Sequence, residues 1–248
     1  MEGKYERIPS DAMGRDVHLW RFGWWGLPIL VFPSAAGFAH EWQKEGMIDT
    51  LSPLLRAGKI KLYCPESNVA EAFTKAGDPR AKVAAHARYE RFILDTMVPY
   101  IRRDCNLPDV RIGTVGCSLG GLYAALFALK FPEVFDWALC MSGRYETSQF
   151  LGGHDSADVY FNNPLAFVPN LRGAALERVR RNTHLTMVCG TGQWEEGCIE
   201  ETIALCDHFQ EKGIPHHRDI WGRESAHHWS WWKKQCVHHL LRRVGVGG

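Results

Sequence analysis

Some segments of this chain have the spacing of hydrophobic residues typical of β-strands, and others have the spacing typical of α-helices. The two kinds of segment follow one another along the chain. Short apolar runs bounded by Gly, Pro or charged residues are typical of buried strands. They predict strands at residues 16–22, 27–32, 60–64, 110–115, 137–141, 185–189 and 217–221. Apolar residues at helical spacing predict helices at residues 43–56, 82–103, 122–129, 199–212 and 229–243, the second with a bend near Pro99. This alternation of strands and helices predicts an α/β fold with a mostly parallel central sheet flanked by helices.

The periodic pattern weakens between residues 143 and 183. This stretch contains Gly152-Gly153 and Asn162-Asn163-Pro164, which interrupt regular structure. It is long enough for a small cap and too short for a second domain. We therefore expect residues 1–248 to form one α/β domain, with residues 143–183 as a cap inserted over the sheet.

The composition excludes several classes of function. Lys and Arg total 29 against 28 Asp and Glu, so the chain lacks the basic surplus of a nucleic-acid-binding protein. The opening residues, MEGKYER, lack the apolar core of a signal peptide, and no apolar stretch is long enough to cross a bilayer, so we expect no membrane partner. The eight cysteines contain no Cys-x-x-Cys pair, which favours reduced thiols in a cytoplasmic protein.

Twelve histidines raise the question of a metal site. Six of them form the adjacent pairs His216-His217, His227-His228 and His238-His239. Neighbouring side chains diverge on a strand or a helix, so such a pair is a poor chelate. The sequence therefore predicts no metal.

The strongest chemical signal is the segment Gly116-Cys117-Ser118-Leu119-Gly120. It follows a predicted strand and precedes an apolar, Ala-rich helical pattern. This strand–turn–helix context is typical of a nucleophile elbow, in which small residues allow a tight turn and the serine stands exposed above the sheet. Ser118 is therefore the candidate nucleophile.

A serine nucleophile needs a base and a carboxylate, expected later in the chain in the order Ser, acid, His. His227 follows the last predicted strand and precedes the last helix, and His228 is the alternative base. The loop after the 185–189 strand offers two acids, Glu195 and Glu196. Asp219, inside a strand, and Glu224, close to His227, are weaker acid candidates.

An acyl-transfer site also needs two backbone N–H groups for the oxyanion. Leu119, directly after the nucleophile, would supply one of them. The loop after the 27–32 strand, Pro33-Ser34-Ala35-Ala36-Gly37, would supply the other through Ala35 or Ser34, because small residues allow close approach of the backbone.

Over nearly its whole length the chain resembles the esterase D-like (putative esterase) family of the α/β-hydrolase superfamily. The matching segments are Pro33–Gly37, Glu45–Met47, His86–Glu90, Val98–Ile101, Gly116–Gly121, Tyr160–Pro164, Trp194–Glu195, Trp221–Gly222 and His227–Trp232. The resemblance implies an α/β-hydrolase fold. It assigns the role of base to His227, because Trp229 follows His227 by two positions, as in the ending typical of the family. It also favours Glu195 as the acid.

These observations predict a serine carboxylic-ester hydrolase for small to medium acyl esters, which works through a Ser118–His227–Glu195 triad and an acyl-serine. Leu119 and Ala35 are the expected oxyanion donors. The partner is a small-molecule ester, and the chemistry requires no metal and no organic cofactor. Two alternatives use the same fold: an acyltransferase that passes the acyl group to another acceptor, and a non-catalytic binding protein.

Overall fold

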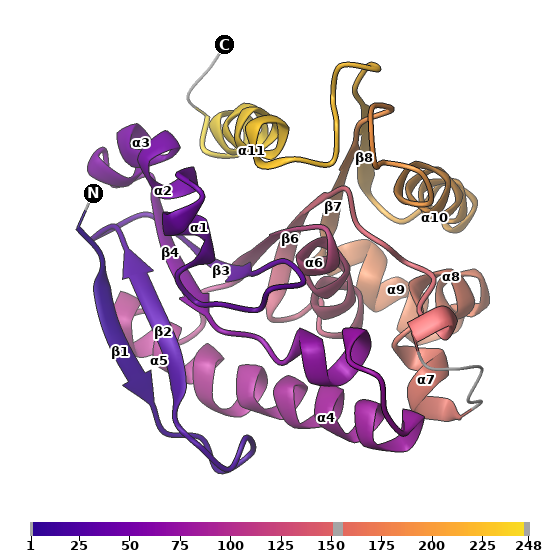
Figure 1. Cartoon of the computed structure of the whole chain (residues 1–248), viewed down its shortest axis with the longest axis horizontal. Coiled ribbons are helices and arrows are strands. Elements are labelled where there is room, and N and C mark those ends of the chain that lie inside the picture. Colours follow the sequence, from indigo (N-terminus) through magenta and orange to yellow (C-terminus); the bar gives the residue numbers. More distant parts are fainter. Residues whose placement is uncertain (1, 151–155, 246–248) are drawn as a thin grey trace.

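An eight-stranded sheet runs through the computed structural model, which describes residues 2–150 and 156–245 (Figure 1). The strands are β1 (Lys4–Ile8), β2 (Val17–Phe22), β3 (Leu27–Phe32), β4 (Ile60–Pro65), β5 (Ile112–Cys117), β6 (Phe135–Met141), β7 (His184–Cys189) and β8 (His216–Ile220). Their order across the sheet is β1-β2-β4-β3-β5-β6-β7-β8. β3 to β8 are parallel to one another, and the β1–β2 hairpin adds an antiparallel edge beside β4. The predicted mostly parallel sheet is confirmed.

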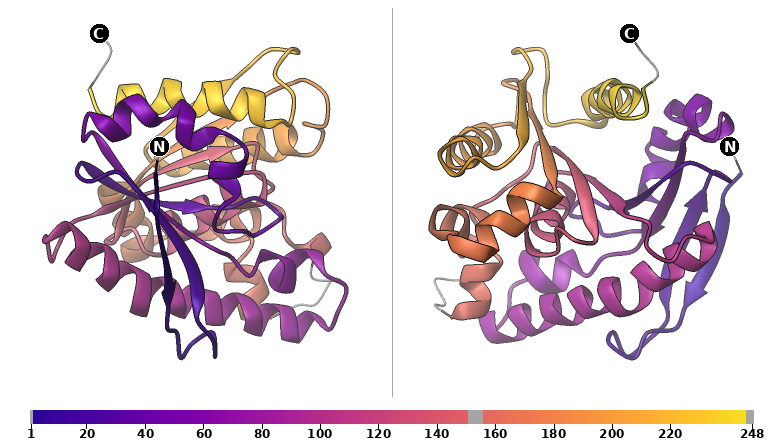
Figure 2. Two further views of the ribbon diagram at one scale, coloured as in Figure 1. Left: turned by 60° about the vertical axis from the view of Figure 1, so that its left-hand side comes forward. Right: turned by 180° about the vertical axis from the view of Figure 1, so that it is seen from behind.

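Helices cover both faces of the sheet, as the two further views show (Figure 2). On one face lie α1 (Glu41–Lys44), α2 (Met47–Thr50), α3 (Ser52–Arg56) and α11 (Trp229–Arg243). On the other lie α4 (Pro79–Phe92), α5 (Val98–Cys105), α6 (Leu119–Lys130), α9 (Gly173–Asn182) and α10 (Cys198–Lys212). Each layer encloses its own apolar core.

The alternation of side chains along the strands divides the core in two. In β6, Ala138 and Cys140 join the cluster beneath α6, whereas Trp137, Leu139 and Met141 join the cluster beneath α11. Successive side chains of a strand point to opposite faces, and here both faces are buried, so the strand reads as a continuous apolar run.

One predicted helix is interrupted in the structure, and a second is continuous but differs in its bounds. The expected helix over 43–56 is three short helices, because Gly46 adopts the left-handed φ of 77° between α1 and α2. The expected helix over 82–103 begins earlier, at Pro79, where the Asp78 side chain accepts a hydrogen bond from the Arg80 N–H. A π-helical segment, Ile93–Met97, then joins α4 to α5, so Pro99 falls in the first turn of α5, where a missing N–H costs nothing.

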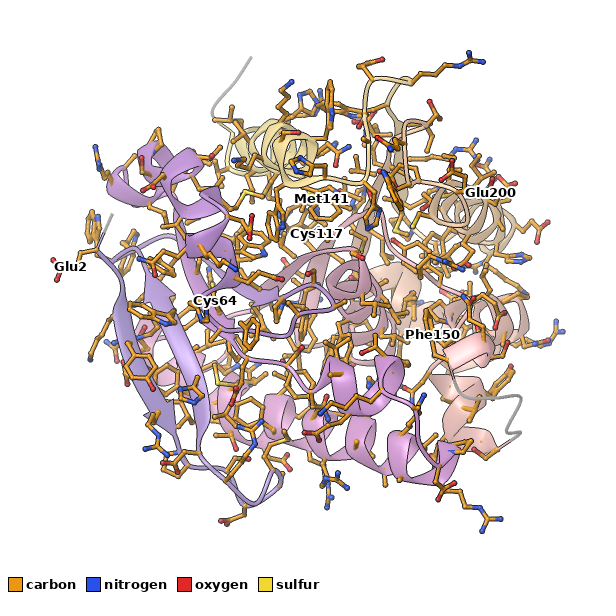
Figure 3. The ribbon with its side chains drawn as sticks, in the orientation of Figure 1. Glu2, Cys64, Cys117, Met141, Phe150 and Glu200 are labelled. Carbon is orange, nitrogen blue, oxygen red and sulfur yellow. The ribbon has the colours of Figure 1, made fainter. Side chains whose placement is uncertain are left out.

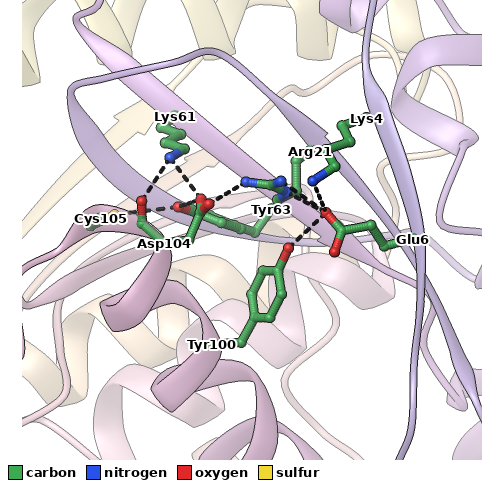
Figure 4. Close-up of polar contacts among 8 residues, drawn as sticks. All are labelled: Lys4, Glu6, Arg21, Lys61, Tyr63, Tyr100, Asp104 and Cys105. Atoms are coloured by element: carbon green, nitrogen blue, oxygen red, sulfur yellow. Dashed lines mark hydrogen bonds and ion pairs between the residues drawn. The ribbon is translucent and has the colours of Figure 1, made fainter.

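The β1–β2 edge is tied to α5 by a network of charged groups (Figure 4). The Asp104 carboxylate accepts from Arg21 and lies 2.6 Å from the Lys61 Nζ. Arg21 also donates to Glu6 over 2.9 Å, and the Tyr100 hydroxyl donates to the same carboxylate oxygen over 2.9 Å. The antiparallel hairpin is therefore held by directional contacts as well as by its ladder. β1 is absent from the sequence prediction because four of its five residues carry polar groups and its one fully apolar side chain is the last.

The segment predicted as a cap contains α7 (Ala157–Phe161), α8 (Pro164–Phe167) and α9 among the described residues, and its residues 151–155 lie outside them. Phe167, Val168 and Val179 join the core on the α6 face, and α8 packs against α10. The idea that residues 143–183 cover the site stays a prediction. None of the helices in the described ranges has the length and apolarity to cross a membrane.

Candidate active site

Ser118 stands at the sharp turn between β5 and α6. Its backbone has φ 56° and ψ −128°, a conformation that residues other than glycine rarely adopt. A Cβ added to Gly116 would lie 2.1 Å from the Gly120 carbonyl oxygen, and one added to Gly120 would lie 2.4 Å from the Phe32 oxygen. The turn therefore admits only glycine at both places. Strain of this kind persists where the surrounding structure holds a functional side chain in position.

A second strained serine lies beside the first. Cys117 and Met141 are register partners at the ends of β5 and β6, and both lie near the middle of the molecule (Figure 3). Ser118 and Ser142 directly follow them, and Ser142 has a φ of 49°. Neighbouring parallel strands thus end in two serines at the same edge of the sheet.

His227 lies in the loop between β8 and α11 and faces Ser118. Its Nε2 is 3.0 Å from the Ser118 Oγ, across 109 positions of sequence. The His227 backbone N–H donates to the Gln193 carbonyl over 2.9 Å, and the imidazole meets the Trp232 indole edge to face at 4.8 Å. These contacts fix the ring while leaving the side chain 20% exposed, open to a substrate.

Glu195 holds the other side of the imidazole. Its Oε2 lies 3.2 Å from the His227 Nδ1, and the carboxylate is only 1% exposed. This contact places the ring proton on Nδ1 and leaves Nε2 free to accept the proton of Ser118. Ser118, Glu195 and His227 are thus brought together from three separate loops. Along the chain they follow the order Ser, acid, His.

The buried carboxylate of Glu195 is satisfied by a group that the sequence analysis missed. The Ser142 hydroxyl donates to Glu195 Oε1 over 2.7 Å, and the Trp232 Nε1 donates to the Ser142 Oγ over 3.0 Å. The Gly190 N–H also lies 3.4 Å from Oε1. A buried carboxylate is costly without such partners. The only sequence signal of this role is the position of Ser142 immediately after a core strand. Many strands are followed by a serine that has no such role.

The alternative candidates occupy other positions. Glu196 is exposed, and so is Glu224. His228 is the N-cap of α11, where its Nδ1 accepts the Ser230 N–H. Asp219 accepts hydrogen bonds from the Trp221 Nε1 and from the buried His239. The structure therefore places His227 beside Ser118 and Glu195 beside His227, rather than any of these alternatives.

The two candidate oxyanion donors lie on either side of the elbow. Leu119 opens α6, so its N–H has no acceptor in a preceding helical turn. The loop after β3 lies against the elbow, because a Cβ added to Gly120 would meet the backbone oxygens of Phe32 and Pro33. Within that loop the Ser34 N–H donates to the buried Glu41 over 2.6 Å, whereas Ala35 is exposed. Of the two residues that the sequence left open, Ser34 has its N–H engaged by Glu41, and the role of Ala35 as a donor stays a prediction.

Two thiols border the imidazole and the carboxylate. The Cys198 Sγ lies 3.9 Å from the His227 Nδ1, and the Cys189 Sγ lies 3.4 Å from Glu195 Oε2. Burial raises the pKa of the Cys198 thiol to about 12, so it is protonated at neutral pH. The ligand atoms of Glu195, Cys198 and His227 are close enough to contact one ion, but the thiol is neutral and the other two groups already pair with each other.

A cavity of about 410 Å³ opens beside His227. It is lined by Gln193, Trp194, Ala226, His227, His228, Ser230 and Trp231. Trp194 stands 69% exposed and has a φ of 70°, a strained backbone directly before the buried Glu195. The cavity therefore combines aromatic walls with the imidazole that faces Ser118.

Comparison with known proteins identifies the family of this chain. The sequence model of the family described as "Putative esterase" matches residues 64–242. The chain is also 24% identical to the diacylglycerol acyltransferase/mycolyltransferase Ag85A of Mycobacterium leprae (strain TN), over 77% of this chain and 63% of the relative. It thus spans less than two thirds of that relative's length.

Solved structures share the fold over almost the full length. A ferulic acid esterase superimposes with a TM-score of 0.76 at 16% identity, covering 100% of this chain and 98% of the other. An S-formylglutathione hydrolase from Agrobacterium tumefaciens superimposes with a TM-score of 0.73 at 14% identity, covering 99% and 95%. These likenesses establish the α/β-hydrolase fold.

Proposed function

Because the chain belongs to the putative esterase family, we propose that it is a serine hydrolase of carboxylic esters that works through an acyl-serine. One observation carries the proposal. The Ser118 hydroxyl, the His227 imidazole and the buried Glu195 carboxylate form a continuous line of hydrogen bonds of 3.0 and 3.2 Å. This is the arrangement that activates a serine hydroxyl for attack on an acyl carbon.

In the first half of the reaction, Ser118 Oγ attacks the ester carbonyl while His227 Nε2 accepts its proton. Glu195 keeps Nδ1 protonated and stabilises the imidazolium that forms. The carbonyl oxygen becomes an oxyanion, which the N–H groups of Leu119 and Ala35 stabilise. Nε2 then returns the proton to the alcohol oxygen, the C–O bond breaks, and the acyl group remains on Ser118.

In the second half, a water molecule takes the place of the alcohol. His227 Nε2 removes a proton from the water as its oxygen attacks the acyl carbon. The tetrahedral intermediate collapses, the acid leaves, and Nε2 returns the proton to Ser118 Oγ. Every proton is thus carried by one ring nitrogen, and no step uses a metal or an organic cofactor.

The cavity beside His227 supports small to medium substrates. Its volume of about 410 Å³ lies toward the lower end of the range typical of small-molecule sites. The exposed indole of Trp194 and the neighbouring Trp231 provide apolar walls for the acyl or alcohol part of the ester. The eight cysteines are all free thiols and seven are buried, which supports a cytoplasmic setting.

Acyl transfer is the second candidate function. The observation in its favour is the 24% identity to a protein whose name includes acyltransferase and mycolyltransferase. The first half of the reaction is the same for both functions, and the two differ in whether water or another hydroxyl attacks the acyl-serine. Adding an alcohol acceptor and measuring the ratio of new ester to free acid separates them.

The test is hydrolysis of p-nitrophenyl esters of increasing acyl length by wild type, Ser118→Ala and Ser52→Ala. Ser52 is a half-buried serine at the start of α3, outside both the site and the predicted cap, and serves as the matched control. We expect Ser118→Ala to lose turnover by at least about 1000-fold and Ser52→Ala to match wild type. Wild-type turnover in Ser118→Ala would refute the proposal. A folded wild type that neither turns over any ester nor reacts with a serine-directed phosphonate would instead support a binding protein.

A further inference from the structure

A second cluster of chemically active side chains lies away from Ser118, between β8 and α11. His217 and Asp219 are two residues apart on β8, so both side chains point to the same face of this edge strand. His239 comes from α11, which covers that face (Figure 1). Its Nε2 lies 3.0 Å from Asp219 Oδ2, and its ring centroid lies 5.8 Å from that of His217.

The ligand atoms of these three residues all lie within 4.8 Å of one another. Two imidazoles and one carboxylate are a donor set that suits zinc and related transition metals. Donors around a tetrahedral zinc at about 2.0–2.1 Å are about 3.3 Å apart, so only a small adjustment of the side chains is needed. The exposed His217 ring is free to make that adjustment, because it lies at the surface.

The surroundings orient the carboxylate and leave room for a further ligand. The Trp221 Nε1 donates to Asp219 Oδ2 over 2.9 Å, an outer contact of the kind that fixes a metal-binding carboxylate. A cavity of about 400 Å³ adjoins His217 and His239 and reaches Arg242 and Arg243. The Arg243 guanidinium pairs with Asp136 at 2.9 Å, so its charge is already balanced.

We propose that His217, Asp219 and His239 form a binding site for a divalent transition metal of the zinc type. Three protein ligands leave a fourth position open toward the adjoining cavity. The metal joins β8 to α11, the two elements that hold the ends of the His227 loop. A bound ion would therefore restrict this loop without contacting Ser118.

The adjacent histidine pairs explain how such a site escapes sequence analysis. Within the 216–217 pair the two side chains diverge, as expected: His216 packs against Phe209 of α10, on the opposite face of β8. The fold instead combines one member of the 216–217 pair with one member of the 238–239 pair. A chelate made across 20 or more positions has no local spacing that a motif could reveal.

The test uses the full chain, freed of metal with a chelator and then titrated with Zn²⁺ by calorimetry. His217→Ala removes an exposed ligand, and His216→Ala on the opposite face is the matched control. We expect His217→Ala to lower zinc affinity by more than about 100-fold, because loss of an outer contact alone costs 10- to 100-fold. Asp219→Asn should show the same loss, and zinc should raise the Tm of wild type and His216→Ala but not of His217→Ala.

Two results would overturn the proposal. One is the lack of saturable zinc binding to wild type. The other is equal affinity in wild type and His217→Ala, which would mean that the Asp219–His239 contact is only a structural hydrogen bond. Phosphonate labelling of Ser118 with and without zinc detects an ion bound instead at Glu195, Cys198 and His227. Zinc at that place would block labelling equally in wild type and in His217→Ala.

Discussion

The Ser142 hydroxyl donates a 2.7 Å hydrogen bond to Glu195 Oε1, although 53 positions separate the two residues. Ser142 follows β6, and Glu195 lies in the loop after β7, so adjacent parallel strands carry them to one edge. Trp232 of α11 in turn donates to Ser142. The contact fixes the carboxylate that orients His227, and it connects the site to the helix that covers the sheet.

Removal of the Ser142 hydroxyl should impair the reaction without removing any reacting group. We expect Ser142→Ala and Ser142→Gly to lower kcat by about 10- to 150-fold with little change in KM, because one hydrogen bond to a charged group is worth about 1.5–3 kcal/mol. Steady-state kinetics measures this effect. Gly tolerates the positive φ of this position better than Ala does, so the two variants should differ in Tm while sharing the loss in kcat. A loss of kcat in Ser142→Ala alone would show that backbone strain, rather than the hydroxyl, is responsible.

The pair Glu195 and Glu196 offers an internal control for the acid. Glu195→Gln keeps the size of the side chain but removes the charge that stabilises the imidazolium, so kcat should fall by about 1000- to 10,000-fold. Glu196 is exposed, and Glu196→Gln should retain wild-type kinetics. Assays of both variants on the same ester decide the matter, and equal activities would exclude Glu195 as the orienting acid.

The elbow should be intolerant of a single methyl group. A Cβ on Gly120 would lie 2.4 Å from the Phe32 carbonyl oxygen, which is backbone and cannot rotate away. Gly120→Ala should therefore destabilise the fold by about 1–3 kcal/mol and should also reduce turnover, since it displaces the Leu119 N–H. Gly77 has open space around its Cβ direction, so Gly77→Ala should change the free energy of unfolding by less than about 0.5 kcal/mol. Urea unfolding compares the two, and equal stabilities would contradict this account of the turn.

Acid should destabilise the protein through a buried histidine outside the site. Burial lowers the pKa of His86 from 6.5 to about 3, so the folded state keeps this ring neutral. Between these two values the unfolded chain binds a proton that the folded chain does not. Stability from this residue is thus complete above pH 6.5 and falls as the pH decreases, by up to about 1.4 kcal/mol per pH unit.

The variant His86→Phe keeps an aromatic ring against Phe73 and Tyr123 but cannot titrate. The free energy of unfolding, measured in urea from pH 6.5 down to pH 5, should decline less steeply in this variant than in wild type. All other titrating groups are common to both proteins, so the difference in slope belongs to His86. Parallel slopes would mean that the ring is charged in the folded state.

Local patterns in the sequence predicted seven of the eight strands, the long helices and the candidate nucleophile. β3 and α11 begin and end where predicted, because a core strand and an amphipathic helix have distinct periods. Ser118 was identifiable because the steric demands of the elbow fall on its immediate neighbours. His227 and Glu195 were predictable as loop residues after particular strands, since parallel strands bring their carboxyl ends to one edge of the sheet. The preference for His227 over His228 came from its place in the loop, and the preference for Glu195 over Glu196 came mainly from the resemblance to a family.

Only the tertiary structure decided what lies beside these residues. The hydrogen bond from Ser142 to Glu195, the engagement of Ser34 by Glu41 and the meeting of His217 with His239 join residues far apart in sequence. Contacts of this kind depend on the order and twist of the strands and on how a helix packs across them, and local propensity specifies none of these. The sequence therefore determined which residue types could carry out the chemistry, and the packing of the sheet and helices determined which of them meet.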